Sequence, residues 1–561
     1  MPSLTKRTRI VLEAAWVAAL CTLAILLTAD HTRGDSITID EPLHIYGGAE
    51  AVSHGVLFTN PEHPPLAKML AALSLQRAHP NAPAIAPGAP LPPLPDVVAF
   101  LRENRVSYAE MLARARMPFR WLLAALIVVV YLSSRAISEG PGRVGREDYA
   151  SRPARPGPSL IARDDRTIWP AVLASALIAL DPNFVAHAGI VHTDVAGTLF
   201  ITLAVVLTIA AVGGSAVRWL LVGLVLGLAI ATKFTALILV PLVLLAPLLL
   251  LLEDKSRLAQ NFAGALAACV VAAFVVYGVY AVNLRNMHPD DAALSSATFL
   301  RSRNADAATV ARYAQLTRRA PEVGMFLSGV KGVQLSSETG RGENYLRGRV
   351  SREGFPHYFF VAFLVKSTPA MLLVTALIFA GGRGLRNRWS IGMLVVVITL
   401  FVVSIPSSFS IGIRHMLPVY PLLAIVGAGV IASRKLAAAL IVSAAISLAL
   451  IHPYELGYFN FIGGPEWLSD SNIDWGQDVD RMHAFLRERG WERDTTVIVF
   501  ALPGLHDVER YRQFNGTLPP GRYATSAYME RVAMPGLFDA LQTRGTRVAK
   551  IGASITIREL R

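Results

Sequence analysis

Long apolar runs alternate with short polar segments over most of the chain. A helix needs about 20 apolar residues to cross roughly 30 Å of hydrocarbon, and about eleven stretches approach that length. The sequence therefore predicts a polytopic α-helical membrane protein with about eleven transmembrane helices. The expected spans lie near residues 10–29, 118–135, 167–185, 195–213, 216–232, 234–252, 261–281, 358–380, 389–404, 415–432 and 436–451.

Charged residues divide these runs and orient them. The fifth and sixth spans form one apolar run, which we break at 231–234 because Lys233 is best tolerated at an interface. Lys6, Arg7 and Arg9 precede the first span without an acid, which predicts a cytoplasmic N-terminus. No small-residue cleavage site follows that span, so we interpret it as a retained anchor.

Counting spans from this end predicts the sidedness of every loop. An inner loop at 136–166 is rich in Pro, Gly and Arg, which favours a flexible cytoplasmic linker. The long outer segments are predicted to carry any chemistry. They are 30–117, 181–194, 282–357 and the whole chain after 452.

The pattern changes near the C-terminus, where apolar runs give way to mixed sequence. Thr496–Leu502 and Arg547–Ile557 are typical of strands and Pro535–Thr543 of a helix. We therefore expect two domains: a transmembrane catalytic domain over 1–452 and a small extracytoplasmic α/β domain over 453–561.

Composition supports the membrane assignment. Hydrophobic residues make up 53% of the chain and charged residues 17%, against about a quarter charged in soluble proteins. Most of the net charge of +13 falls in the predicted inner segments, so it indicates orientation and removes the support for nucleic-acid binding. Cys21 and Cys269 both lie in apolar runs and cannot build a disulfide framework.

The first outer loop carries two acidic motifs, Asp40-Glu41-Pro42 and Glu62-His63 ahead of Pro64-Pro65. Proline fixes φ and holds such acids on ordered turns at the membrane surface. A carboxylate there can act as a general base toward a hydroxyl. Equally, Asp40 can cap a helix that starts at Pro42.

A second outer turn concentrates His187, His192 and Asp194 within a few residues. These side chains could bind a divalent metal, but a spacing of five residues does not align two histidines on one helical face. We therefore expect no cofactor to be required, and favour a catalytic or orienting role for Asp194. Acids at this depth are costly and usually functional.

Basic residues recur where spans meet the outer face, at Lys68, Lys233, Arg285, Lys366 and Arg414. Each can be an interfacial anchor, with its charge extended to water. Several together would form a socket for a lipid phosphate, since Arg offers planar paired donors and Lys a point charge.

The segment after the last span contains Asn472, Asp474 and Trp475 in a polar, aromatic and Gly-marked run. This mixture suits a sugar site, with a ring to stack on and polar groups for hydroxyls. The same run also fits an Asx-rich turn that caps the helix following it.

Taken in order, these motifs resemble the family 39 glycosyltransferases. The resemblance rests on Asp-Glu and Glu-His-Pro-Pro-Leu-x-Lys in the first loop, His-Thr-Asp in the second, Lys-Ser-Thr-Pro before a late span, and Arg-His-Met-Leu-Pro-x-Tyr-Pro. Those enzymes have the GT-C fold and are similar to protein O-mannosyltransferases and lipid A aminoarabinose transferases. The Asp-Ser-Asn-Ile-Asp-Trp-Gly-Gln run further resembles a bacterial subgroup that depends on a phospholipid carrier.

The resemblance implies an inverting glycosyltransferase that moves a hexose or pentose from a polyprenyl-phosphate donor to an acceptor at the outer face of a bacterial cytoplasmic membrane. The acceptor is a lipid, a glycan or a protein. The catalytic residues it implies are Asp40, Glu41 and Asp194. Substrate binding is assigned to Glu62, His63, Lys68, His192, Lys366, Arg414, His415, Asn472, Asp474 and Trp475.

In two of these positions the chain departs from the family pattern. His63 stands where aminoarabinose transferases carry Lys, and His415 stands where Tyr is common.

Two other classes of function remain as alternatives. One is a transporter or flippase of a lipid-linked saccharide, and the other is a structural protein whose outer loops bind cell-wall polymers.

Overall fold

The computed structural model describes residues 6–139, 168–252, 255–340, 342–380 and 387–561. Within these ranges six helical segments are long and apolar enough to cross a membrane, two more spans are possible as bent helix pairs, and three apolar helices are shorter. Each predicted span corresponds to one of these elements. The chain is therefore a multi-pass helical membrane protein, as predicted.

The long segments are single helices with one exception. They are α1 (Lys6–His31), α5 (Tyr108–Glu139), α9 (Asp194–Ala211), α12 (Leu258–Asn283), α20 (Arg434–Ile451), and the 234–252 stretch, which is divided into η1 (Phe234–Ile238), α11 (Leu239–Leu245) and η2 (Ala246–Leu252), with the short η3 (Lys255–Arg257) before α12.

The remaining spans are bent or short. Proline after the bend accounts for both broken pairs, because it removes a backbone donor and disfavours the helical state of the residue before it. The pairs are α7 (Ile168–Ala179) with α8 (Pro182–Ala188), bent by 56°, and α16 (Tyr358–Lys366) with α17 (Pro369–Ala380), bent by 120°. The shorter helices are α10 (Ala216–Thr232), α18 (Arg388–Ser404) and α19 (Val419–Val430).

The predicted break in the long apolar run is confirmed, since α10 ends at Thr232 and η1 begins at Phe234. Two other boundaries differ. The span expected to start at 118 belongs to α5, which begins ten residues earlier and continues through Pro118. The predicted inner loop 136–166 lies almost entirely outside the described residues.

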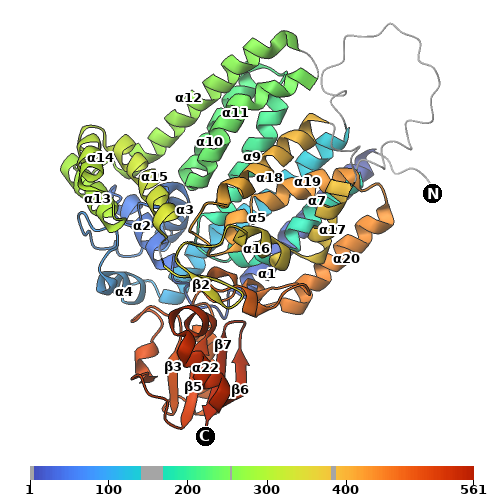
Figure 1. Cartoon of the computed structure of the whole chain (residues 1–561). Helices are drawn as coiled ribbons and strands as arrows, with labels where there is room; N and C mark the ends of the chain where they lie inside the picture. The colour runs from blue at the N-terminus through green and yellow to red at the C-terminus, as the bar shows by residue number, and fades with distance from the viewer. Residues whose placement is uncertain (1–5, 140–167, 253–254, 341, 381–386) are drawn as a thin grey trace.

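The two long outer segments fold into short helices. The first contains α2 (Glu41–His54), α3 (Pro65–Gln76) and α4 (Leu94–Arg102). The second contains α13 (Pro289–Ser302), α14 (Ala307–Arg319), α15 (Pro321–Thr339) and the antiparallel hairpin of β1 (Asn344–Leu346) and β2 (Arg349–Ser351). Helices α2 and α4, the hairpin and the C-terminal sheet gather toward one end of the helical bundle (Figure 1).

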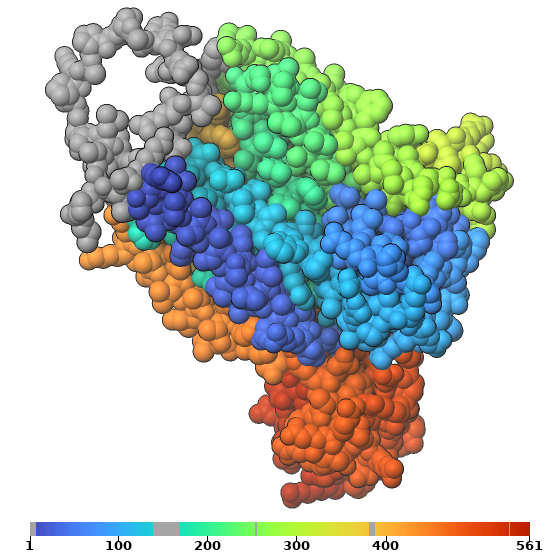
Figure 2. Space-filling view, turned by 180° about the vertical axis from the view of Figure 1, so that it is seen from behind, coloured from blue at the N-terminus to red at the C-terminus, as the bar shows by residue number. Residues whose placement is uncertain are grey.

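A five-stranded sheet with strand order β4-β3-β5-β7-β6 forms the C-terminal region. It contacts the rest of the chain at one end only (Figure 2). Pairing is parallel between β3 and its neighbours β4 and β5, and antiparallel among β5, β7 and β6. The elements are α21 (Val479–Arg489), β3 (Thr495–Ile498), β4 (Arg512–Gln513), β5 (Gly521–Ser526), α22 (Pro535–Arg544), β6 (Gly545–Ile551) and β7 (Ile555–Leu560).

This region agrees with its predicted α/β character, with one correction. The single strand expected over Arg547–Ile557 is wrong, because β6 and β7 are two antiparallel strands. The turn between them includes Gly552 at φ +55°, a conformation that favours glycine. The turn is only three residues long, Gly552 to Ser554, and the sequence prediction ran the two strands together across it.

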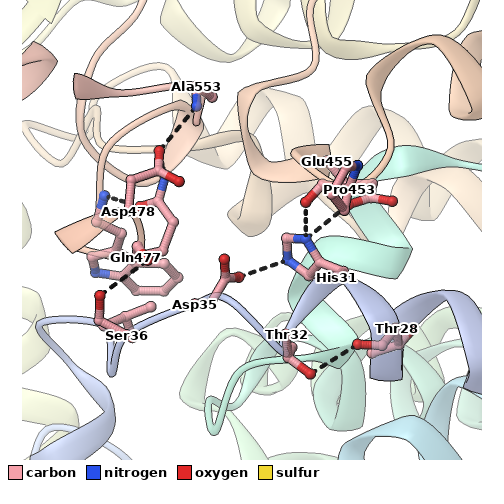
Figure 3. A network of polar contacts seen from close by, with 12 residues as sticks. Thr28, His31, Thr32, Asp35, Ser36, Pro453, Glu455, Gln477, Asp478 and Ala553 are labelled. Carbon is pink, nitrogen blue, oxygen red and sulfur yellow. Dashed lines mark hydrogen bonds and ion pairs between the residues drawn. The ribbon is translucent and has the colours of Figure 1, made fainter. Parts of the chain in front are cut away.

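A buried polar network fastens the C-terminal region to the end of α1 (Figure 3). His31 lies between two carboxylates, 3.2 Å from Asp35 and 2.8 Å from Glu455. The backbone amide of Ser36 donates to the carbonyl of Gln477 over 2.9 Å. Residues 470–478, named the tail segment below, are thereby held next to the start of the first outer loop.

Candidate active site

Asp40 stands directly before α2, where a helix cap was one of its two predicted roles. Its backbone is helical (φ −88°, ψ −26°) and its side chain makes no capping hydrogen bond. Instead, its Oδ2 lies 3.3 Å from Nη1 of Arg414 and 3.7 Å from Nε2 of His192. The side chain is 36% exposed. Asp40 therefore presents a carboxylate that is oriented by a cation and still accessible.

Glu41 is adjacent in sequence and has a different environment. Both of its oxygens pair with the guanidinium of Arg116 on α5, at 2.8 and 2.6 Å, and they also accept the amides of Thr38 and Val191. The residue is 0% exposed. With these four hydrogen bonds made, Glu41 ties the first loop to α5 and to the second outer turn.

The second outer turn supports Asp40 through His192. Asp194, the first residue of α9, lies 2.6 Å from Nζ of Lys233 and 2.7 Å from Nδ1 of His192. This contact fixes the ring and leaves its Nε2 facing Arg414, 3.0 Å away. Lys233 was predicted at an interface, but it is buried and neutralises Asp194. Asp194 thus orients His192 and is itself buried, so it contacts Asp40 only indirectly, through His192.

Three imidazoles meet beside this pair. His44 on α2 lies 4.8 Å from His63 and 4.6 Å from His192, measured between ring centroids. Both nitrogens of His44 are buried without a hydrogen-bond partner among the described residues. Burial lowers the pKa of His44 and of His63 well below the usual histidine value. These two rings are therefore neutral at physiological pH.

This group differs from His187, His192 and Asp194, the residues that the sequence offered as a metal set while favouring no metal. In the part of the chain that the structure describes, the acids, histidines and cysteines that approach closely enough for a shared metal ion are His44, His63 and His192. The ring of His187 instead faces Trp475 at 6.1 Å. The sequence analysis did not propose His44 as a site residue. Its position three residues after Glu41 on the same helix could have suggested it, because residues with this spacing lie side by side on a helix.

Two of the predicted substrate-binding residues, Lys68 and Glu62, are paired with groups of the first loop and its neighbours. Lys68 is buried, donates to the carbonyls of Thr59 and Asn60 over 3.3 and 2.8 Å, and has its pKa lowered to about 7 by burial. Glu62 pairs with Arg303 over 2.8 Å. These side chains hold the first loop in shape, and the structure supplies each with a partner from the chain itself.

Lys366 is also paired within the chain, next to the tail segment. Its Nζ donates to the carbonyls of Leu456 and Asn472 over 2.8 and 2.7 Å. His415 follows Arg414 in a short 3-10 turn, and its Nε2 is buried without a partner among the residues described. Of the predicted phosphate-binding cations, Arg414 is the one that the structure places beside Asp40.

The tail segment holds Arg414 in place. The guanidinium of Arg414 lies 4.2 Å from the ring centre of Trp475, and the side chain of Asn472 accepts the amide of Ile413 over 3.0 Å. Trp475 is 2% exposed. It therefore has no free face on which a sugar could stack, and its predicted role in direct sugar contact does not fit this geometry.

Asp474 is buried and accepts the amides of Tyr528 and Gly476 over 2.7 and 3.3 Å. Burial raises its pKa to about 7. Asp470, which the sequence did not single out, has a left-handed φ of +56°, a strained conformation for a residue with a side chain. Burial raises the pKa of Asp470 to about 6.

Together these residues form a polar site at one end of a multi-pass helical bundle, with an accessible carboxylate, a stacked guanidinium and a supporting Asp-His pair. The model of a protein family described as dolichyl-phosphate-mannose-protein mannosyltransferase matches residues 160–282. The chain resembles that family over this stretch, in line with the predicted resemblance. The match includes His192, Asp194 and Lys233. None of the curated proteins matches the sequence.

The chain also has similarity to solved structures, of which three follow. ArnT from Cupriavidus metallidurans, bound to undecaprenyl phosphate, is 12% identical over 97% of this chain and 98% of that one, with a TM-score of 0.48. The Archaeoglobus fulgidus oligosaccharyltransferase AglB, in complex with an inhibitory peptide and a dolichol-phosphate, is 13% identical over 92% and 70%, with a TM-score of 0.44. The S. cerevisiae protein O-mannosyltransferase Pmt1-Pmt2 complex bound to the sugar donor is 19% identical over 54% and 34%, with a TM-score of 0.28.

Proposed function

We propose that the chain is an inverting glycosyltransferase that moves a sugar from a polyprenyl-phosphate donor to a lipid, glycan or protein acceptor. The observation that carries the proposal is the pairing of Asp40 with Arg414, because it puts an accessible base and a fixed cation within one site. The family match adds support, since its description names a transfer from a lipid phosphate.

The geometry supports a single displacement at the anomeric carbon of the sugar. Asp40 takes the proton from the acceptor hydroxyl or amine while that atom bonds to the anomeric carbon. The bond from the anomeric carbon to the phosphate oxygen breaks, and the lipid phosphate leaves with the electron pair. Arg414 offers planar N–H donors to the departing phosphate, which is already a good leaving group and needs no proton.

The other residues near the site act by holding these two. Asp194 aligns His192, and Nε2 of His192 lies 3.0 Å from Nη1 of Arg414. Trp475 covers the face of the Arg414 guanidinium. Such positioning contributes to rate because displacement reactions require near-contact geometry between base, acceptor and donor.

The proposal includes a location. The loops and the C-terminal sheet that surround Asp40 lie at one end of the bundle, and the basic N-terminal residues favour a cytoplasmic N-terminus. We therefore place the site at the outer face of the bacterial cytoplasmic membrane, with membrane lipids around it. A donor drawn from the membrane needs no nucleotide-binding motif, and the proposed displacement requires no cofactor.

The test is a reconstitution. The purified full chain is placed in liposomes with a polyprenyl-phosphate donor carrying a radiolabelled sugar and a membrane extract as the source of acceptor. We expect label in a new glycosidic bond, recovered with the acceptor fraction. Movement of the intact labelled donor between leaflets without a new bond would overturn the proposal and favour the flippase alternative.

A further inference from the structure

The cluster of His44, His63 and His192 has a second feature besides its ring contacts. One nitrogen from each of the three rings lies within 4.8 Å of the other two. The rings come from three separate places in the chain: helix α2, the loop before α3, and the turn before α9. Such convergence of side chains 19 and 148 residues from His44 is not a consequence of local helix geometry.

His44 points to a ligand for this cluster. It is 1% exposed, and neither of its nitrogens has a hydrogen-bond partner among the described residues. Leaving a buried polar group unpaired is energetically costly, so native proteins rarely keep one without a use. A bound ion would give this imidazole a partner.

His192 has the support that metal-binding histidines usually have. Its Nδ1 contacts the carboxylate of Asp194 at 2.7 Å, which leaves Nε2 as the available ligand atom. A carboxylate behind the ring fixes the tautomer and raises the basicity of the nitrogen that faces the metal. Asp194 is in turn held by Lys233.

We propose that His44, His63 and His192 bind a transition-metal dication of the Zn²⁺ class. Imidazole nitrogens suit Zn²⁺ better than Mg²⁺ or Ca²⁺, which prefer oxygen ligands. Zinc holds imidazole nitrogen at about 2.0–2.1 Å, so two ligands in tetrahedral geometry lie ~3.4 Å apart. Binding therefore draws the three rings inward by about an ångström.

The site competes with Arg414. In the structure Nη1 of Arg414 lies 3.0 Å from Nε2 of His192, and an arginine keeps its charge at any physiological pH. Zinc binding and the hydrogen bond from Arg414 therefore both require the lone pair on Nε2 of His192. Removal of the arginine charge should strengthen zinc binding, whereas removal of an imidazole should weaken it. This inference does not rest on the proposed function, since it concerns binding alone.

The test measures zinc directly. The full chain, with its affinity tag removed, is stripped with a chelator and equilibrated with buffered free Zn²⁺, and bound zinc is counted by mass spectrometry. We expect one zinc ion per chain. His44→Ala and His63→Ala should each weaken binding at least 10-fold, a loss comparable with that seen when only the support of a metal ligand is removed.

Two further variants sharpen the result. His187→Ala removes a buried histidine outside the cluster and should leave zinc affinity unchanged, while Arg414→Gln should raise it. Cobalt substitution gives an independent readout, because Co²⁺ in a tetrahedral site has a visible spectrum and His44→Ala should abolish it. Thermal melting identifies variants that fail to fold, and for these His44→Gln replaces the alanine variant.

Absence of stoichiometric zinc in the wild type, or equal binding in the wild type and in folded His44 and His63 variants, would overturn the proposal. A chain that binds zinc through this cluster but transfers no sugar would refute the proposed function and leave the metal site standing.

Discussion

The start of α2 and the tail segment both contribute polar side chains to the same site, and they differ in how these side chains are satisfied. Asp40 has one cation beside it and an exposed face. In the tail segment, Asn472, Asp474 and Trp475 are buried, with polar partners for the first two and a guanidinium against the third. In the proposed mechanism the loop therefore supplies the reacting group, and the tail segment positions Arg414 beside it.

The same contrast exists between neighbours. Asp40 and Glu41 are chemically alike and adjacent, yet one is accessible and the other has both oxygens occupied by Arg116 and backbone amides. Burial and pairing, more than residue type, decide which carboxylate can take a proton from a substrate. Four predictions test this contrast.

The largest effect is expected for Asp40→Asn. The amide keeps the size of the side chain but cannot accept the proton, so the transfer rate should fall by about 10²–10⁴-fold. The melting temperature should fall by less than in Glu41→Gln, because Asp40 makes no capping bond and its pair with Arg414 is partly exposed. Initial rates from labelled donor, normalised to folded protein, give the result. A rate within threefold of the wild type would remove Asp40 from the mechanism.

Glu41→Gln should mainly affect stability. It leaves the buried Arg116 guanidinium without its counter-charge, and breaking a buried pair in this way costs about 3–5 kcal/mol. Thermal melting in detergent measures the loss. Glu110→Gln is the matched control, since Glu110 forms an exposed pair with Arg114 and should melt like the wild type. Equal melting of the two variants would contradict the structural role of Glu41.

Trp475→Phe should give an intermediate effect on rate. The smaller ring retains part of the contact with Arg414, and a cation–π contact in a desolvated site is worth about 2 kcal/mol, so we expect a loss of up to ~30-fold, chiefly in kcat. Trp467→Phe disturbs a similar pair with Arg347, also 4.2 Å from ring to guanidinium, and should leave the rate unchanged. The same loss in both variants would remove any specific role for Trp475.

The smallest effect concerns pH. Burial raises the folded-state pKa of Asp474 from 3.8 to about 7. A carboxyl with a raised pKa stabilises the fold below its unfolded value and loses this contribution as pH rises through the folded value. Asp474→Asn should therefore melt at a higher temperature relative to the wild type at pH 8 than at pH 5. The exposed Asp539→Asn should show no such difference.

The fold was predictable because its main constraint is solvation. A chain segment within a bilayer must be apolar over a defined length and helical, so each span is visible as a run in the sequence. The hairpin of β6 and β7 was missed, since its turn at Gly552 to Ser554 is only three residues long and the strands on either side have similar composition. Loop helices such as α13–α15 are short and pack mainly against one another, so they left no long apolar run in the sequence.

The sequence predicted several residues that lie together in the site. It predicted the role of each residue much less well. Motif order pointed to Asp40, His192, Asp194 and Arg414, which the structure brings together. It could not distinguish Asp40 from Glu41, because the partner of Glu41 is Arg116, 75 residues away. Trp475 looked like a sugar platform until the folded tail segment buried it against Arg414. Long-range contacts decide these roles.

The most direct test of the account is the ratio of two rates. Transfer of labelled sugar from a polyprenyl-phosphate donor is measured for Asp40→Asn and Glu41→Gln, each divided by the amount of folded protein. The account predicts that Asp40→Asn is slower than Glu41→Gln by at least about 10²-fold, since Asp40 alone of the pair can reach the acceptor proton. Equal rates, or a slower Glu41→Gln, would contradict it.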